Sequence, residues 1–449
     1  MFENKKILIL GFARSGYEAA KVLIKRNNEV YLNDAKSEGK VDSLKKEELE
    51  KLGVKLIFGT HPDDLLDESF DYLIKNPGVP IDHKYVIEAR KLNIPVINEV
   101  EMSYHLLPKN ISIIGITGTN GKTTTTTITY EIMKKAYPDI THLAGNIGYP
   151  LSSIIDKVKE NDIIVMECSC QQGENFIDFH PHVGVMTNLS EAHIDFMKTY
   201  EHYKDTKSKM FENQDENDIA IMNYDNNDVM NQLKNIKSQK KYFSTKEETD
   251  CFVKDNYIVY HNEKIISLDD IKIKGMHNVE NCMAAISAVK EYHVSNEIIV
   301  DVIKNFKGVE HRLEYVDTVN GVEYYNDTEA TNIKCCQIAL NSFNKPIILF
   351  LGGLERGQDF NELTPYMNNV KAIIAIGQCR NRVEEYAKKI NKDVYVFEHL
   401  IDGFDKTNEI VEKGDVVLLS PASASWDQYK ECEVRGAEFK QKVSELKHE

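Results

Sequence analysis

The sequence predicts an α/β protein of three domains: a Rossmann-like N-terminal domain, a central P-loop ATPase-like domain with a mainly parallel sheet, and a C-terminal Rossmann-like domain. Three observations predict this fold class. Short β-branched runs alternate with longer helical segments, which is typical of parallel sheets covered by helices. Many of these runs end in glycine or small polar residues, where α/β proteins bind ligands. At 449 residues, the chain is also too long for one ordinary domain.

The first domain is expected over residues 1–107. It opens with a strand at Lys6 to Leu10, a glycine-containing turn, and a helix that ends near Lys25. Ala13 occupies the place of the middle glycine in the dinucleotide-binding pattern, so NAD is disfavoured. The turn is compatible with a bound nucleotide or phosphate, and equally with glycines that only shape the backbone. Further strands are predicted at Glu29–Leu32, with Asp34 just past its end, and at Tyr72–Ile74 and Ile94–Ile97.

The second domain is expected over residues 108–308 and begins with a phosphate-binding loop. Ile111 to Ile116 predicts a buried strand, and a threonine-rich helix is predicted to run to Lys135. The glycine loop between them lets backbone N–H groups and the helix N-terminus face phosphate oxygens. The first glycine of the usual pattern is displaced, since Ile116 stands at its position, so the loop is a variant. It nevertheless predicts binding of a nucleoside triphosphate through Gly118, Thr119, Asn120, Gly121, Lys122, Thr123 and Thr124.

Two later strands of this domain end in candidate metal ligands. The strand Asp162–Met166 delivers Glu167, which could hold Mg²⁺ or could be a surface carboxylate at a strand end. The strand Val183–Thr187 precedes His193, which is compatible with a metal site or with an ordinary polar loop. The remaining elements are a helix at 200–211 whose lysines 204, 207 and 209 read as a solvated face, short strands and turns over 212–270, and a helix at 275–293.

The third domain is expected over residues 309–449. Its predicted strands each run into small or polar residues suited to a ligand cleft. They lie at Val322–Asn326, Pro346–Leu351, Ala372–Ile376 and Val416–Ser420.

Composition narrows the possible functions. A net charge of −16 argues against general nucleic-acid binding. No stretch has the roughly 18 apolar residues that a membrane span needs, and the N-terminal apolar run is too short for a signal peptide. The eight cysteines include no C-x-x-C pair and are expected to be reduced thiols in the cytoplasm.

Five motifs in order across the chain resemble the Mur ligase family. They are Thr117 to Thr124, Gly145-Asn146-Ile147-Gly148, His277-Asn278-x-x-Asn281, His311-Arg312, and the pair formed by Gly352 to Gly357 and Ser420 to Gln428. The last pair is most similar to the member that adds D-glutamate to UDP-N-acetylmuramoyl-L-alanine. The resemblance implies that ATP phosphorylates a carboxylate, and that the amine of an amino acid then attacks the acyl phosphate in peptidoglycan synthesis.

The same resemblance implies roles for individual residues. Catalysis would use Lys122, Glu167, His193 and Lys207, the last as a carbamate that turns an ammonium into an anionic ligand. Two Mg²⁺ ions would be held by Thr123, Glu167, His193 and the Lys207 carbamate. ATP would also contact Asn278, Asn281, His311, Arg312 and Asp327. The UDP substrate would contact Arg14, Ser15, Asp34, Asn76, Gly78 and Asn146, and the amino acid would contact Thr331, Arg356 and Ser425. A cytoplasmic monomer is expected, with a C-terminal domain that closes over the site.

Three departures from the family pattern leave alternatives open. Glu329 stands where a lysine is expected, Cys170 lies in an altered segment after Glu167, and Cys432 replaces an aromatic residue. These departures do not affect the residues expected to bind ATP and metal, but they leave the identity of the acceptor amino acid open. The alternatives are the same chemistry with a different acceptor, a folylpolyglutamate synthase, which shares the central loop, or a non-catalytic nucleotide-binding relative. We expect Glu329 to point away from the acceptor or to pair with a cation.

Overall fold

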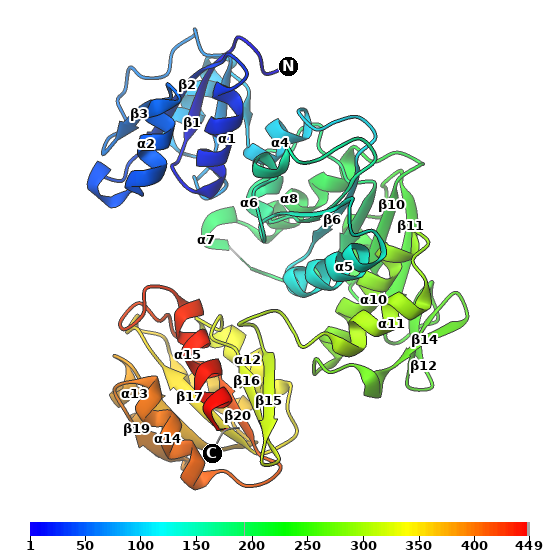
Figure 1. Cartoon of the computed structure of the whole chain (residues 1–449), viewed down its shortest axis with the longest axis vertical. Helices are drawn as coiled ribbons and strands as arrows, with labels where there is room; N and C mark the ends of the chain where they lie inside the picture. Colours follow the sequence, from blue (N-terminus) through cyan, green and yellow to red (C-terminus); the bar gives the residue numbers. More distant parts are fainter. Residues whose placement is uncertain (193, 447–449) are drawn as a thin grey trace. The chain divides into compact units, whose positions relative to one another are not determined.

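The computed structural model describes residues 1–192 and 194–446 (Figure 1). The chain forms two compact units, one of residues 1–266 with 280–302, and one of residues 267–279 with 303–449. Within the described residues, three separate sheets, of five, nine and six strands, follow one another along the sequence. Most neighbouring strands are parallel, which confirms the predicted α/β class. No helix in the described part of the chain is long and apolar enough to cross a bilayer.

The N-terminal sheet has the strand order β3-β2-β1-β4-β5, and all its recorded pairings are parallel. Alternate residues of β1 face opposite sides: Ile7 and Ile9 pack with α1, α2 and α4, while Leu8 and Leu10 pack with α3. This two-sided burial is what the continuous apolar run predicted. The elements are β1 (Lys6–Leu10), α1 (Arg14–Ile24), β2 (Glu29–Asp34), η1 (Glu38–Lys40), α2 (Ser43–Lys51), β3 (Lys55–Phe58), β4 (Tyr72–Lys75), α3 (Lys84–Lys91), β5 (Val96–Ile97) and α4 (Glu99–Tyr104).

The nine-stranded sheet has the order β14-β13-β12-β11-β10-β9-β6-β8-β7. Counted across the sheet from β7 to β12, and including β6, neighbouring strands are parallel, whereas β13 runs antiparallel to β12. The predicted strands and helices all form, with ends shifted by a few residues, and the 212–270 segment also contains a short helix. The elements are β6 (Ser112–Thr117), α5 (Lys122–Ala136), β7 (Thr141–Gly145), η2 (Leu151–Ile154), β8 (Ile163–Glu167), α6 (Cys170–Gly173), β9 (Val183–Met186), α7 (Ile194–Met197), α8 (Tyr200–Glu212), β10 (Ile219–Asn223), α9 (Asn227–Gln232), β11 (Gln239–Ser244), β12 (Cys251–Lys254), β13 (Tyr257–Tyr260), β14 (Glu263–Ser267), η3 (Leu268–Asp270), α10 (Met276–Lys290) and α11 (Asn296–Asn305).

The C-terminal sheet has the order β15-β16-β20-β17-β18-β19. Only the β15–β16 edge pair is antiparallel among its recorded pairings. Helices α12 and α13 pack on one face, and α14 and α15 pack on the other, so the sheet is doubly wound as predicted. The elements are β15 (Glu314–Val319), β16 (Val322–Asn326), α12 (Ile333–Asn341), β17 (Ile347–Gly352), η4 (Phe360–Tyr366), β18 (Val370–Ile376), α13 (Arg380–Lys389), β19 (Asp393–Val396), α14 (Leu400–Ile410), β20 (Val416–Leu419) and α15 (Cys432–Glu445).

Candidate active site

The loop between β6 and α5 has the backbone of an anion-binding turn. Gly118 and Gly121 have φ values of +146° and +78°, a region that favours glycine. A Cβ at Gly118 would lie 1.9 Å from the Thr187 hydroxyl oxygen, and one at Gly121 would lie 2.1 Å from Asn281 Oδ1. Helix α5 then begins at Lys122 with no side-chain cap. Its N-terminal amides are therefore oriented to meet a phosphate, as the sequence predicts.

Asn188, which follows β9, holds this loop in shape. The backbone N–H of Thr119 donates to the Asn188 carbonyl at 2.8 Å, and that of Asn120 donates to Asn188 Oδ1 at 2.9 Å. Asn188 was not predicted as a site residue from the sequence. The available signal was the position of β9 beside β6 in a parallel sheet, which brings the residues after both strands to one edge.

The side chains of the loop lysine and threonines extend from the start of α5. Lys122 Nζ donates to the Thr119 carbonyl at 2.9 Å, within the loop itself. Thr123 and Thr124 follow on the first turn of the helix and are half-buried. Lys122 and Thr123 are thus the first two residues of α5, directly after the glycine loop, at the end of the helix that would meet a phosphate.

Glu167 is the last residue of β8 and pairs in register with Ile116 of β6. Its side chain is 1% exposed. Oε1 accepts a 2.7 Å hydrogen bond from Asn146 Nδ2, whereas Oε2 is buried with no hydrogen-bond partner. A buried carboxylate oxygen without a donor is costly unless a cation or a ligand meets it. The Glu167 carboxylate therefore fits a Mg²⁺ ligand rather than a surface residue, and Asn146 orients it.

Lys207 does not belong to a solvated face, and the prediction from the lysine pattern of α8 was wrong for it. The side chain is 3% exposed, and Nζ donates to the Gly118 carbonyl at 2.6 Å. Burial lowers the pKa of Lys207 to about 7, with a further contribution from the nearby Lys122 ammonium. Burial and a neutral amine are what carbamate formation needs, because CO₂ reacts with the unprotonated nitrogen. On the same helix, Lys204 bonds Glu201 at 2.9 Å, and Lys209 bonds the Glu174 carbonyl.

The structure therefore brings four predicted residues to one edge of the central sheet: Gly118, Lys122, Glu167 and Lys207. The pKa of Lys207 responds to the charges of both Lys122 and Glu167, so the three charged groups share one electrostatic environment. The fourth predicted catalytic residue, His193, lies outside the described residues.

The predicted adenine or ribose contacts, Asn278 and Asn281, lie one turn apart on α10. Asn281 Oδ1 accepts from the Thr125 hydroxyl of α5 at 3.3 Å, so this side chain lies against the phosphate loop's helix. Asn278 Nδ2 donates to the Lys274 carbonyl at 2.8 Å.

His311, Arg312 and Asp327 lie in the second unit. Asp327 is buried at the end of β16, where it accepts from the Leu313 N–H at 3.0 Å and the Ser420 hydroxyl at 2.7 Å. Burial raises the pKa of Asp327 to about 7 despite these donors. His311 has a left-handed backbone and its Nδ1 lies 2.9 Å from Asn326 Nδ2. These bonds fix the segment 311–313 against the carboxyl end of β16.

The three residues predicted to meet the amino acid also belong to the second unit. Ser425 is buried, and its hydroxyl oxygen has no hydrogen-bond partner. The Arg356 guanidinium carbon lies 4.7 Å from the ring centroid of Trp426. The Thr331 N–H donates to the Glu329 carbonyl at 2.8 Å. The unpaired Ser425 hydroxyl is the feature among these that points most directly to a ligand.

Most of the predicted UDP-substrate residues lie at or just after the carboxyl ends of β1, β2 and β4, whereas Asn146 follows β7. Asp34 uses both carboxylate oxygens on backbone N–H groups, of Phe12 at 2.7 Å and Lys36 at 2.8 Å. Asn76 follows β4, and its Nδ2 is buried without a partner. The Arg14 guanidinium donates to the Gly148 carbonyl, in the motif that contains Asn146. Ser15 lies in the first turn of α1, and Gly78 lies in the turn after Asn76.

Arg435 on α15 is a buried cation that was not predicted from the sequence. Its guanidinium donates to the Thr328 hydroxyl at 2.9 Å, the Thr328 carbonyl at 3.0 Å and the Ser423 carbonyl at 3.1 Å. Burial lowers the pKa of Arg435 to about 10. The side chain joins the loop that carries Thr331 to the loop that carries Ser425. No sequence signal distinguished it from a surface arginine.

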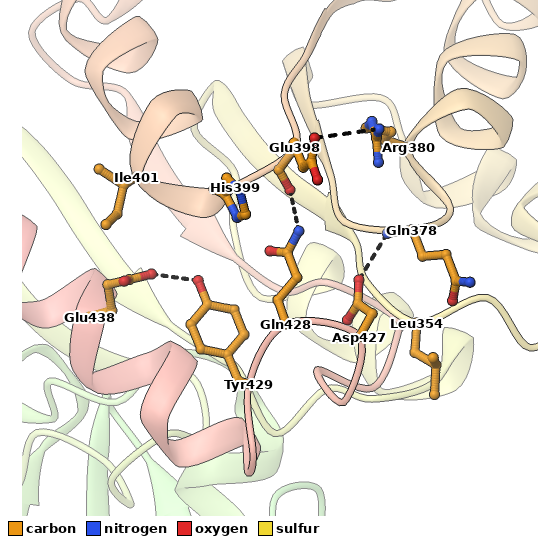
Figure 2. A pocket seen from close by; sticks show the side chains of 10 residues that line it. All are labelled: Leu354, Gln378, Arg380, Glu398, His399, Ile401, Asp427, Gln428, Tyr429 and Glu438. Carbon is orange, nitrogen blue, oxygen red and sulfur yellow. Dashed lines mark hydrogen bonds and ion pairs between the residues drawn. The ribbon is translucent and has the colours of Figure 1, made fainter.

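A pocket of about 640 Å³ opens at the carboxyl edge of the C-terminal sheet (Figure 2). None of the predicted site residues lines it, but it borders the loops that carry Arg356 and Ser425. The lining residues are Leu354, Gln378, Arg380, Glu398, His399, Ile401, Asp427, Gln428, Tyr429 and Glu438.

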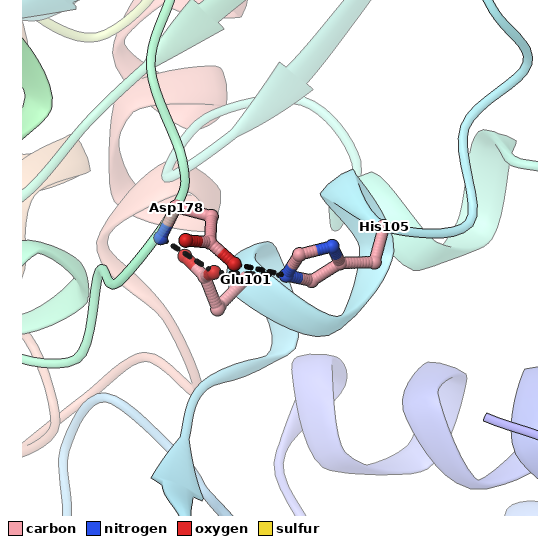
Figure 3. A group of neighbouring side chains, drawn as sticks. All are labelled: Glu101, His105 and Asp178. Carbon is pink, nitrogen blue, oxygen red and sulfur yellow. Dashed lines mark hydrogen bonds and ion pairs between the residues drawn. The ribbon is translucent and has the colours of Figure 1, made fainter. Parts of the chain in front are cut away.

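Glu101, His105 and Asp178 form a separate group whose polar atoms converge (Figure 3). The backbone N–H groups of Ile177, Asp178 and Phe179 donate to the Glu101 carboxylate at 2.8–3.1 Å. His105 Nε2 lies 3.1 Å from Glu101 and 3.2 Å from Asp178. These contacts account for the group as an anchor of the 177–179 segment on α4.

Two regions of the chain match known protein families. Residues 116–289 match the Mur ligase middle domain, and residues 311–423 match the Mur ligase, glutamate ligase domain. The UDP-N-acetylmuramoylalanine–D-glutamate ligase of Enterococcus hirae is 42% identical over 450 residues, covering 99% of this chain and 97% of that protein. The enzyme of the same name from Bacillus cereus (strain G9842) is 41% identical over 456 residues, covering 99% and 98%.

Solved structures share the fold over nearly the whole chain. MurF ligase from Thermotoga maritima, in complex with ADP, has a TM-score of 0.60 at 19% identity and covers 94% of this chain and 97% of its own. UDP-N-acetylmuramate–alanine ligase MurC from Thermotoga maritima has a TM-score of 0.59 at 16% identity, covering 98% and 99%.

Proposed function

Because the chain belongs to the Mur ligase family, as its motifs predicted, we propose that it is an ATP-dependent ligase that joins D-glutamate to UDP-N-acetylmuramoyl-L-alanine in peptidoglycan synthesis. The observation that carries this proposal is the 42% identity to a D-glutamate ligase over 99% of the chain. The arrangement of Lys122, Glu167 and Lys207 beside the glycine loop supports the ATP-dependent part.

The proposed chemistry solves a problem of reactivity. A carboxylate is a poor electrophile, because attack on it adds negative charge and would expel oxide. In the first step, an oxygen of the alanine carboxylate attacks the γ-phosphorus of ATP, and ADP leaves. In the second step, the amine of D-glutamate attacks the acyl carbon, phosphate leaves, and the nitrogen loses a proton. The products are the amide, ADP and phosphate.

Residues of this chain would act mainly by position and charge. The amides at the start of α5 and the Lys122 ammonium would hold the transferring phosphoryl group. In the second unit, the Arg356 guanidinium and the Ser425 hydroxyl would hold the carboxylates of D-glutamate. Thr331 would complete the amino-acid site.

The family also implies Mg²⁺, and the residues present fit it. The buried, unpartnered Oε2 of Glu167 is a carboxylate oxygen of the kind that Mg²⁺ prefers. Thr123 and carbamylated Lys207 would be further ligands, with His193 for a second ion. Bound Mg²⁺ would offset the negative charge of the phosphates during transfer.

The remaining predictions concern substrate binding and cellular context. Arg14, Ser15, Asp34, Asn76, Gly78 and Asn146 would bind the UDP substrate, and Asn278, Asn281, His311, Arg312 and Asp327 would bind ATP. We propose a cytoplasmic location, because both nucleotide substrates are made there, and a monomer. The domain limits 1–107, 108–308 and 309–449, and closure of the C-terminal domain, stay predictions.

Phosphate release from ATP tests the proposal directly. The purified chain is supplied with ATP, MgCl₂ and UDP-N-acetylmuramoyl-L-alanine, together with one member of a panel of D- and L-amino acids. We expect phosphate release and a product heavier by one glutamyl residue only with D-glutamate. Activity with another amino acid would show that this amino acid, and not D-glutamate, is the acceptor. Activity with a folate and L-glutamate would point to a folylpolyglutamate synthase, and no turnover with any acceptor would point to a non-catalytic relative.

A further inference from the structure

The side chain of Arg356 lies against an aromatic ring instead of a carboxylate. Its guanidinium carbon is 4.7 Å from the ring centroid of Trp426, within the range of a cation–π contact. In the part of the chain that the structure describes, no Asp or Glu oxygen lies within ion-pair distance of this guanidinium. The positive charge is therefore oriented by the ring without being neutralised.

Glu355, the acidic residue next to Arg356 in the sequence, pairs with a different cation. The Glu355 carboxylate pairs with Arg382 and also accepts from the Gly357 N–H at 2.7 Å. The backbone of Arg356 is itself fixed, since its N–H donates to Gln358 Oε1 at 2.9 Å. The loop after β17 thus holds the backbone of Arg356 firmly and turns Glu355 away from its guanidinium.

Hydrogen bonds hold the loop that carries Trp426 in place, while the ring itself stays at the surface. Asp427 accepts from the Gln378 N–H at 2.8 Å, and Gln428 Nε2 donates to the Glu398 carbonyl at 2.6 Å (Figure 2). Trp426 nonetheless remains 64% exposed. The ring is therefore open to a ligand that approaches Arg356, while the loop beneath it is fixed by these two hydrogen bonds.

One residue ties the two loops together. Gln378 donates its backbone N–H to Asp427, while its side-chain Oε1 accepts from the Glu355 N–H at 3.2 Å. The Leu354 N–H also donates to the Ala424 carbonyl at 2.8 Å. The relative position of Arg356 and Trp426 is therefore set by the backbone of both loops. Ser425, whose buried hydroxyl has no partner, directly precedes the ring.

We propose that Trp426 is a positioning residue that holds the Arg356 guanidinium ready for a carboxylate of the incoming amino acid. The inference rests on the proposed function, because it assigns Arg356 to a dicarboxylic acceptor. The flat ring fixes the plane of the guanidinium and limits its rotamers, so that less freedom is lost when the carboxylate binds. An aliphatic side chain at position 426 would leave the charge in place but not its orientation.

Two substitutions test the contribution of the aromatic ring separately from that of the loop. Trp426→Leu removes the aromatic face, and Trp426→Phe keeps a smaller one. We expect Trp426→Leu to raise the KM for D-glutamate about tenfold, with kcat and the KM for ATP nearly unchanged, and Trp426→Phe to recover most of the loss. A KM for D-glutamate within about twofold of wild type in Trp426→Leu would overturn the proposal, as would a parallel change in all kinetic constants.

A second measurement does not depend on activity. Trp426 is the single tryptophan of the chain, so intrinsic indole fluorescence reports this site alone. We expect Arg356→Leu to increase quenching of Trp426 by acrylamide, because the guanidinium no longer covers one face of the ring. Lys388→Leu, which removes an exposed positive charge from α13, should not change it. Equal quenching in wild type and Arg356→Leu would show that the stack does not exist and would overturn the inference.

The kinetic and the quenching experiments together distinguish failure of this inference from failure of the proposed function. If wild type fails to ligate D-glutamate, the proposed function fails, and the quenching experiment still decides whether the stack exists. If wild type ligates D-glutamate and Trp426→Leu is unaffected, only the positioning role fails. Circular dichroism of each variant checks that the fold is retained.

Discussion

The Arg312 guanidinium lies 3.7 Å from the Glu329 carboxylate, between Nη2 and Oε2. The backbone brings the two together, because the Glu329 N–H donates to the His311 carbonyl at 3.1 Å. Glu329 is the residue at which the family pattern predicts a lysine, and pairing with a cation was one of two expected outcomes. With side chains 53% and 29% exposed, the pair contributes little to stability, but it offsets the negative charge of Glu329.

This pairing predicts a small effect of reversing the charge. Glu329→Lys should change the KM for D-glutamate by less than about tenfold, because the carboxylate it replaces is already offset by Arg312. Glu329→Gln is the matched control, since it removes the charge without adding a cation next to Arg312. Steady-state kinetics with D-glutamate and ATP varied in turn measure both effects. A gain of about a hundredfold in D-glutamate use would mean that the natural acceptor is a different amino acid.

Lys122→Ala should abolish ligation while leaving the fold intact. The ammonium lies at the mouth of the glycine loop, where it would offset charge on the transferring phosphoryl group. Lys134→Ala, an exposed position near the other end of α5, is the control and should keep full activity. Phosphate release and circular dichroism are measured together. A folded Lys122→Ala enzyme with more than a few per cent of wild-type turnover would contradict the assignment of the loop.

Lys207→Ala should be nearly inactive and should regain part of its activity with formate or acetate. A short carboxylic acid can occupy the buried space beside Gly118 and supply the anionic oxygens that the carbamate would provide. Lys204→Ala on the same helix should be active and insensitive to added acid, because Lys204 bonds Glu201 instead. Turnover is measured across a series of acid concentrations at constant ionic strength. Full activity of Lys207→Ala without acid would show that this lysine is not the carbamate.

The contrast between Glu167 and Lys207 shows what could be predicted from the sequence. Glu167 follows a continuous apolar run, and the carboxyl end of a buried parallel strand is a defined place in the fold. Lys207 lies on a helix with a weak amphipathic pattern between two other lysines, so local periodicity does not distinguish the buried one. Its burial arises from the packing of α8 beneath the loop after β6, residues that are about 90 positions apart. Only the family motif identified it.

Asn188 and Arg435 were missed for a related reason. Each acts on backbone carbonyls or N–H groups of a segment distant in sequence, and neither belongs to a pattern of residue types. The antiparallel edge strand β15 was also missed, because its residues are mostly half-buried and include no continuous apolar run. Elements with a continuous apolar run, such as β17, were predicted to within one residue at each end.

Arg435→Leu should destabilise the C-terminal domain by about 2–4 kcal/mol, because three oxygens of the Thr328 and Ser423 segments lose their buried donor. Unfolding by urea, followed through the fluorescence of Trp426, reports this domain selectively, since the chain has no other tryptophan. Gln441→Ala, an exposed position on the same helix, should change the free energy of unfolding by less than about 0.5 kcal/mol. An unchanged urea midpoint in Arg435→Leu would mean that the guanidinium does not join the two loops. If the midpoint falls as expected, the loops carrying Thr331 and Ser425 are held together by a side chain that does not itself meet the substrate.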